Sequence, residues 1–193
     1  MDCAIEVIAE AGVAQASLAR IAQRAGVAKS VVLYHFANKD ELAEQVLAAI
    51  SLASYETLPG RLASATTARD KLLAILESLV DFIGSNRAYA LAALETGNQA
   101  LSLPARAKMD DAGIAGIRQL FVEGQENGEF GEFDPHVMSV MFRQALMAAV
   151  LEAAVNPNAD LRAFAAELVG MFDRATRREN HDEGHDHRGG VAG

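Results

Sequence analysis

The sequence predicts an all-α protein, and three observations lead to this class. Alanine, the residue with the highest intrinsic helix propensity, occurs 38 times among the 193 residues, whereas proline occurs only four times. β-Branched residues rarely cluster, as they would in strands. Apolar residues recur instead at intervals of three and four, the spacing of a helix with one buried face. The length is sufficient for one medium domain or two small ones with a hydrophobic core.

The composition also excludes several classes of protein. The single cysteine, Cys3, has no partner for an internal disulfide, and the sequence does not open with the basic and apolar regions of a secretory signal. The longest uninterrupted apolar runs, Ala88–Leu94 and Ala145–Leu151, have seven residues each, far fewer than the ~20 that span a bilayer. We therefore expect a cytoplasmic protein without disulfides or membrane-spanning segments.

Three short helices are predicted at the start of the sequence. The first, Cys3–Ala11, has apolar residues along one face and ends at a glycine, as helices often do. Ser17 is a favourable N-cap for the second helix, Leu18–Arg24. Gly26 then interrupts the pattern before the third helix, Ala28–His35. Two short helices joined by a tight, glycine-containing turn form a helix-turn-helix motif, whose second helix can enter the major groove of DNA.

Longer helices are predicted for the remainder of the chain. A helix capped by Asn38 or Asp40 should run to about Leu58, where Pro59-Gly60 and a stretch rich in Ser, Thr and Ala end it. The pair Asp134-Pro135 is typical of a helix start. The further helices are expected at Thr67–Ser85, Arg87–Glu95, Ala105–Asn127, His136–Val155 and Leu161–Arg178, with a loop or short turn at Thr96–Pro104.

The charge of the chain is unevenly distributed. The formal net charge is −9, which by itself disfavours a polyanionic partner. However, the segment from Gln15 to Lys39 contains four basic residues and no acidic one, whereas the chain after Lys39 contains 13 basic and 23 acidic residues. A nucleic acid would therefore be repelled by most of the surface and accepted at one end only.

The segment Ala25–Phe36 is the most informative part of the sequence. We expect Val27, Val32 and Phe36 to hold its helix to the core. The outer turns should present side chains that hydrogen-bond to bases and phosphates, namely Lys29, Ser30, Tyr34 and His35. Together with the following Asn38–Leu42, this pattern resembles the TetR family of one-component transcriptional regulators over about Ala4–Leu47. The rest of the chain resembles the family only in being helical.

The resemblance implies a set of DNA contacts. Base edges would be contacted by Lys29, Ser30, Val31 and Tyr34, and the DNA backbone by Ser17, His35 and Lys39. The chain departs from the family pattern at Ala28, where a capping Ser or Thr is usual, and at Leu33, where Tyr is usual. Its first helix also begins about ten residues later than is usual in the family. The alternative is that Arg24 and Lys29 are ordinary solvated charges and that Tyr34 and His35 are packing residues.

The family resemblance also implies a homodimer on palindromic operator DNA, formed through the last two helices. His136–Val155 is apolar nearly all round, as expected for a helix buried against its own core and against a partner. Burial within one protomer is the alternative explanation. The expected interface residues are Ala145, Ala148, Ala149, Glu152, Leu161, Ala165, Leu168 and Phe172.

An effector pocket is the other feature that the resemblance implies. Methionine and aromatic side chains adapt to apolar ligands, and the candidates are Phe82, Tyr89, Met109, Phe121, Met138, Met141 and Phe142. Each of them could equally belong to an ordinary core. Few polar residues accompany them, so we expect an apolar or amphipathic effector, whose identity the sequence does not reveal.

The sequence gives little sign of a metal site, a reactive cysteine or a catalytic site. His181, His185 and His187 lie among carboxylates and could bind a transition metal, but a segment without a scaffold binds metal weakly. Cys3 has no basic neighbour to activate it. The chain contains no glycine-rich phosphate loop, no HExxH motif and no nucleophile beside a base. We expect neither enzymatic activity nor a cofactor.

These inferences combine into one expected organisation. Residues 1–47 form a helix-turn-helix DNA-binding head, residues 48–178 a helical body that binds effector and dimerises, and residues 179–193 a disordered His- and Gly-rich tail. The expected function is a ligand-responsive transcriptional regulator, a repressor that a small effector releases from its operator. The alternative is a helical small-molecule-binding or interaction protein with a weakened DNA-binding head.

Overall fold

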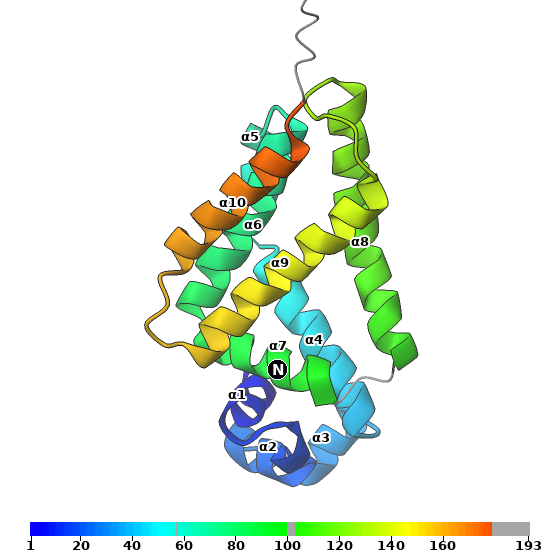
Figure 1. Cartoon of the computed structure of the whole chain (residues 1–193). Coiled ribbons are helices and arrows are strands. Elements are labelled where there is room, and N and C mark those ends of the chain that lie inside the picture. Colours follow the sequence, from blue (N-terminus) through cyan, green and yellow to red (C-terminus); the bar gives the residue numbers. More distant parts are fainter. Residues whose placement is uncertain (57, 100–102, 179–193) are drawn as a thin grey trace, which may run out of the picture.

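The structure, a computed structural model, describes residues 1–56, 58–99 and 103–178. Within these ranges all regular secondary structure is helical, which confirms the predicted all-α class (Figure 1). The helices form two packed groups: a small group at the amino-terminal end, called the head below, and a larger group, called the body. The His-rich tail, residues 179–193, lies outside the described residues.

The head consists of four helices and one short 3₁₀ turn. Its elements are α1 (Asp2–Ala11), η1 (Val13–Gln15), α2 (Leu18–Ala25), α3 (Lys29–His35) and the first turns of α4 (Lys39–Ser54). Apolar side chains from all four helices meet in one core, which includes Ile5, Ile8, Ile21, Val32, Leu42 and Val46. This core fixes α3 at the lower end of the molecule in Figure 1.

Local signals explain most of the helix ends in the head. The Ser17 hydroxyl accepts a hydrogen bond from the backbone N–H of Arg20, which caps α2 as predicted. Gly26 ends α2 in the left-handed region, with φ of 68°, where glycine carries no steric penalty. Asn38 caps α4 by accepting from the N–H of Glu41. By contrast, α3 begins after Ala28 without a side-chain cap.

Within the described residues, the body contains six helices. They are α5 (Leu58–Ser64), α6 (Ala68–Ser85), α7 (Arg87–Gln99), α8 (Leu103–Glu126), α9 (Pro135–Val155) and α10 (Leu161–Thr176). An aromatic cluster lies at the centre, where the ring of Phe121 is 5.8 Å from Phe130, 5.6 Å from Phe133 and 6.1 Å from Phe142. Phe121 is completely buried, so this cluster determines how α8 and α9 pack.

Helix α9 crosses the body diagonally (Figure 1). It packs against α6, α7, α8 and α10, and one face of it enters the core through Phe142, Leu146 and Val150. Among the described residues it is the one helix whose length and hydropathy would suffice to cross a membrane. The core helix of a packed helical body has the same properties, and the neighbours of α9 place it in that position.

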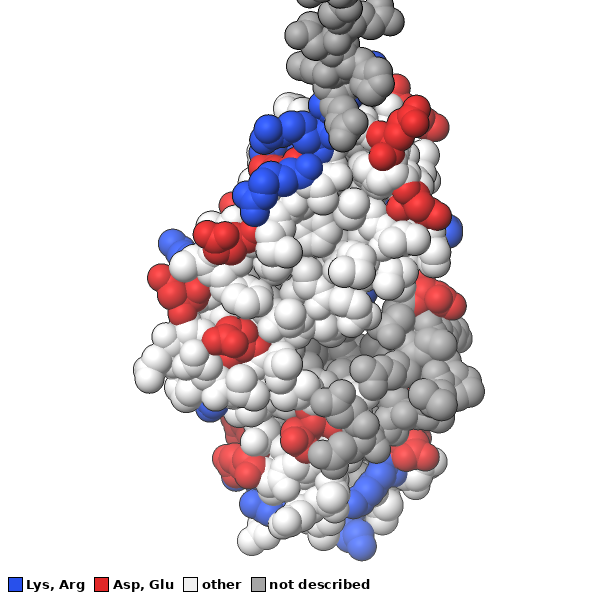
Figure 2. All heavy atoms as spheres, viewed as in Figure 1, with Lys and Arg blue, Asp and Glu red and all other residues white. Residues whose placement is uncertain are grey.

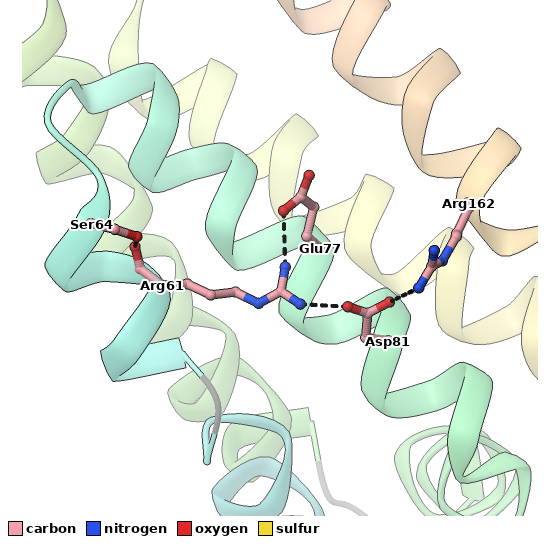
Figure 3. Close-up of polar contacts among 5 residues, drawn as sticks. All are labelled: Arg61, Ser64, Glu77, Asp81 and Arg162. Carbon is pink, nitrogen blue, oxygen red and sulfur yellow. Dashed lines mark hydrogen bonds and ion pairs between the residues drawn. The ribbon is translucent and has the colours of Figure 1, made fainter.

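The prediction that Pro59-Gly60 ends the helical region is wrong, because both residues lie in the short helix α5. Proline is tolerated in a first turn, where its missing N–H has no intrahelical partner. Tertiary ion pairs then hold α5 in place, since the Arg61 guanidinium lies 2.9 Å from Glu77 and 2.5 Å from Asp81 on α6. Figure 3 shows that Asp81 also contacts Arg162 of α10, at 3.4 Å. These partners are distant in sequence, so no local pattern announces α5.

The loop predicted at Thr96–Pro104 is also largely wrong. Helix α7 continues to Gln99, and α8 already begins at Leu103. Thr96 is completely buried, and this packing outweighs the low helix propensity of Thr, Gly and Asn in the segment. Pro104 is the second residue of α8, where proline again fits. Residues 100–102 lie outside the described part.

The aromatic cluster leads to a test of the core. Phe121→Ala should lower the free energy of unfolding by about 3–5 kcal/mol, because it removes a ring that packs against three others. Urea denaturation followed by circular dichroism measures this loss. The matched control is Tyr34→Ala, which removes an exposed ring and should change stability by less than about 0.5 kcal/mol. Equal effects of the two substitutions would show that the cluster does not organise the body.

Candidate nucleic-acid interface

Helix α3 presents one side to the core of the head and the other to solvent. Val32 is the buried residue of α3, and Phe36, which follows the end of the helix, is half-buried. The four residues expected at base edges, Lys29, Ser30, Val31 and Tyr34, are all exposed. Tyr34 is 87% exposed, and its ring meets His35 edge-on at 5.4 Å. Val27, which we expected to anchor the helix, is exposed as well, because it lies in the turn before α3 and not on its inner face.

The three residues expected at the DNA backbone surround this face. Ser17 lies at the start of α2 and Lys39 at the start of α4, where free backbone N–H groups favour an anion. The Lys39 ammonium donates to the carbonyl of Ala14, at 2.9 Å, so it also ties α4 to η1. An ammonium has three N–H groups, and the side chain stays exposed, so this bond leaves capacity for a phosphate.

Arg24 differs from the other basic residues of the segment from Gln15 to Lys39. It is not a free surface charge, because its guanidinium lies 3.1 Å from Glu6 and 2.5 Å from Glu10 on α1. The hydrogen bond from Arg24 holds the pKa of the Glu10 carboxyl below its usual value, and the same pairing raises the pKa of Arg24. The ion pairs link α2 to α1 and remove one positive charge from the acid-free segment. The partners lie 14 and 18 residues earlier in the chain, so sequence spacing does not reveal them.

The remaining charges of the head are arranged as the sequence predicted. In the view of Figure 2, Lys and Arg side chains gather at the lower end, where α2 and α3 lie, and acidic side chains flank them higher up. Arg20 on α2, Lys29 on α3 and Lys39 on α4 are exposed. A short exposed helix with basic residues around it can enter a major groove while neighbouring cations approach the phosphates.

These features define a helix-turn-helix DNA-binding protein whose small head is joined to a helical body. Residues 1–46 match the family described as "Bacterial regulatory proteins, tetR family". This match lies within the head and confirms the resemblance to the TetR family that the sequence of this segment indicated.

Solved structures show the same fold over nearly the whole chain. The transcriptional regulator FadR from Bacillus subtilis, in complex with stearoyl-CoA, has a TM-score of 0.78 at 20% identity, covering 88% of this chain and 94% of that one. The fatty acid degradation regulator FadR from Bacillus halodurans has a TM-score of 0.75 at 21% identity, with coverages of 88% and 94%. A tetR-family regulatory protein from Rhodococcus RHA1 has a TM-score of 0.70 at 22% identity, with coverages of 93% and 95%. A search of curated proteins finds no significant match.

The residues expected to line an effector pocket are distributed over several environments. Phe121 and Phe142 are buried in the body core, and Phe82 and Met138 pack against it half-buried. Tyr89 lies at the contact between the head and α7, where its hydroxyl donates to Asp2 at 3.3 Å. The side chain of Met109 lies outside the described part. The cavity that touches Phe121 and Phe142 holds about 70 Å³, which admits no more than a few water molecules.

Met141 is placed differently from the expectation. Its side chain is 58% exposed on the outer face of α9 and therefore lines no pocket within the protomer. Two residues that the sequence analysis overlooked are Ser78 on α6 and Thr96 on α7. Their hydroxyls are buried and have no hydrogen-bond partner among the described residues. A single Ser or Thr inside a predicted helix gives no sequence signal that its hydroxyl is buried and lacks a hydrogen-bond partner.

The residues expected at a dimer interface fall into two groups. Ala149 and Ala165 are buried inside the protomer and cannot contact a partner. Ala148 is exposed, and the others are half-buried: Ala145, Glu152, Leu161, Leu168 and Phe172. Six of the exposed apolar side chains nearby are called the outer stripe below: Val137, Met141, Ala148, Leu151 and Val155 on α9, with Met171 on α10. Successive residues of the outer stripe on α9 are three, four or seven positions apart in the sequence. These spacings place them on one side of the helix.

The Glu10–Arg24 pair makes the stability of the head depend on pH. Because the pKa of Glu10 is lowered in the folded state, its ionisation stabilises the fold above the ordinary value of 4.5, and this contribution disappears as the pH falls through the lower folded pKa. Glu10→Gln should therefore be less stable than the wild type at pH 7, and the two should converge below pH 4.5. Urea midpoints measured between neutral and acidic pH give this difference.

The control for this experiment is Glu44→Gln, at an exposed position on α4 without an ion pair among the described residues. It should leave the urea midpoint nearly unchanged at every pH. A Glu10→Gln deficit that persisted undiminished in acid would show that the carboxylate does not act through Arg24.

Proposed function

We propose that this chain is a ligand-responsive repressor that binds palindromic operator DNA as a homodimer and is released by a small apolar or amphipathic effector. In this proposal residues 1–47 are the DNA-binding head, residues 48–178 bind effector and dimerise, and residues 179–193 are a dispensable tail. The exposed face of α3 within the acid-free segment from Gln15 to Lys39 is the observation that carries the proposal. The site of action is the cytoplasm, where bacterial DNA is located.

The outer stripe supports a dimer formed through α9 and α10. Isolated apolar side chains are common on protein surfaces, but several of them along one side of a helix are typical of a contact with another protein surface. A second copy offers a matching stripe by symmetry. A two-fold dimer places two copies of α3 about 34–36 Å apart on one face of a duplex, which matches a palindrome.

The body supports an effector that is mainly apolar. The half-buried Phe82 and Met138 can adapt to a ligand, and the unpartnered hydroxyls of Ser78 and Thr96 would gain hydrogen bonds from polar atoms of an amphipathic molecule. FadR from Bacillus subtilis, which shares this fold, was crystallised with stearoyl-CoA, a molecule with a long apolar chain and a polar head. We therefore take acyl compounds as the first effectors to test.

Helix α7 provides a route from effector to DNA. It packs against α9 in the body and against α1 and α4 in the head. An effector that binds better to one position of α7 shifts the population toward that position and changes the spacing of the two heads. The loss of operator affinity then equals the difference in effector affinity between the two states.

A second candidate function is a helical ligand-binding protein with a weakened head. Two observations favour it: α3 lacks a side-chain cap at Ala28, and Arg24 is neutralised by Glu6 and Glu10. Selection from a random duplex library at low salt, followed by a gel shift, separates the candidates. Enrichment of a palindrome supports the repressor, whereas binding of acyl compounds without any bound duplex supports the alternative.

The proposed division of labour between phosphate and base contacts can be tested by two substitutions. Lys39→Ala should weaken binding to all duplexes alike and reduce the slope of log affinity against log salt by about one, because one phosphate contact is lost. Tyr34→Ala should change the preferred sequence. The control is Lys71→Ala, which removes a lysine that pairs with Glu123 in the body and should alter neither property. Identical sequence profiles for the Lys39 and Tyr34 variants would contradict the division.

The outer stripe can be tested by placing a charge on it. Leu151→Glu should convert the dimer to a monomer in sedimentation velocity, because an unpaired carboxylate would be buried between the two copies. Leu52→Glu is the matched control, since Leu52 is an exposed leucine on α4 outside the stripe. Operator affinity should fall with dimerisation, because one head loses the effective concentration that the second supplies. A Leu151→Glu protein that remained dimeric would place the interface elsewhere.

A further inference from the structure

Three of the six exposed side chains of α3 are apolar or aromatic, and Val27 in the preceding turn is exposed as well. Tyr34 is 87% exposed, and Val27, Val31 and Leu33 are each between 42% and 46% exposed. The other exposed side chains of α3 are those of Lys29, Ser30 and His35. A surface helix normally places apolar side chains inward, so three aliphatic side chains and an aromatic ring on the outer side require a partner with apolar groups.

The positions of these side chains follow from the helix geometry. At 100° per residue, Ser30 and Tyr34 lie opposite the buried Val32, with Val31 on one flank and Leu33 on the other. Val27, in the preceding turn, is exposed as well. Any duplex that receives α3 in its major groove therefore meets Ser30 and Tyr34 at the centre of this face, with Val31 and Leu33 on its two sides.

The same helix lacks the side chains that read purines most strongly. Arginine forms paired hydrogen bonds with guanine, and asparagine or glutamine with adenine. Helix α3 contains none of the three. Of the two arginines on the preceding helix α2, Arg24 is held by Glu6 and Glu10 on α1, whereas Arg20 is exposed. Lysine can contact guanine, so Lys29 is the one strong purine reader that α3 offers.

Only one base presents an apolar group in the major groove. Thymine has a 5-methyl group there, whereas the other edges consist of hydrogen-bond donors and acceptors. We propose that α3 recognises thymine 5-methyl groups, through Val31 and the ring of Tyr34, with Val27 and Leu33 excluding water around them. The operator half-site then carries thymines beneath α3. This inference rests on the proposed DNA-binding function and specifies the chemistry of its partner.

Replacing thymine by deoxyuridine tests the inference, because it removes the methyl group and keeps the base pair. The full-length chain is first used to select a duplex from a random library. Each thymine of that duplex is then replaced singly by deoxyuridine. Affinity should fall about fourfold for each contacted methyl group, the effect of exposing one such group to water. We expect at least one such position in each half-site.

Variants of α3 show whether the protein contacts the methyl group itself. In Val31→Ala, one of these positions should lose its sensitivity to deoxyuridine, because the side chain that covers the methyl group is shortened. Lys29→Ala is the matched control on the same helix: it should weaken binding to the thymine and deoxyuridine duplexes equally and leave their ratio unchanged. Melting temperatures verify that both variants are folded.

Several outcomes would overturn the inference. Equal affinity for the thymine and deoxyuridine duplexes at every position would show that no methyl group is read. The same losses as in the wild type at every position, in Val31→Ala and in Tyr34→Ala alike, would assign the effect to DNA stiffness. A large loss with 7-deazaguanine, without any effect of deoxyuridine, would assign recognition to guanine and Lys29. Failure to select any duplex at low salt would instead contradict the DNA-binding function itself.

Discussion

The packing of α7 between α1 and α9 is the contact on which the rest of the structure depends. Small side chains on opposite faces of α7 make it possible: Ala92 is buried in the core of the head, and Ala90 is buried in the core of the body. Alanines allow neighbouring helices to approach closely, and a larger side chain at either position would have to displace a helix because protein cores are densely packed. The head is thus fixed to the body by packing as well as by the continuous helix α4.

Specific side chains reinforce this contact. The ring of Phe82 packs against both cores and meets the Tyr89 ring edge-on at 5.4 Å. Burial, followed by the nearby carboxylate of Asp2, raises the pKa of Tyr89, so its hydroxyl stays protonated and donates to that carboxylate. The bond joins α7 to the first turn of α1. A movement of α7 in response to an effector would therefore be transmitted directly to the helix against which α2 and α3 pack.

The head could be predicted from the sequence far better than the body. The reason is the sequence distance over which the stabilising interactions act. Ser17, Gly26 and Asn38 act through hydrogen bonds or backbone angles within three or four residues, so their positions in the sequence determine where helices begin and end. The partners of Arg24 and Arg61 lie 14 to 20 residues away. Neither the neutralisation of Arg24 nor the existence of α5 could be read from local patterns.

The orientation of α9 could not be predicted from the sequence for a different reason. Its sequence is apolar nearly all round, so periodicity does not distinguish the face that enters the core from the face that remains outside. Ala148 and Ala149 are adjacent and chemically identical, yet only Ala148 is exposed. Met141 and Phe142 differ in the same way, which is why the sequence analysis assigned Met141 to a pocket. Only the packing of neighbouring helices resolves such pairs.

The most direct test of the account is amide hydrogen exchange of the full-length chain, measured with and without a duplex selected by that chain. If α7 couples head and body, binding of the duplex should slow exchange in α3, which contacts the DNA, and also in α7, which packs behind the head. Helix α5, held against α6 by the ion pairs of Arg61, serves as the internal reference and should change little. Slower exchange confined to α2 and α3, with α7 unchanged, would contradict the coupling that the account requires.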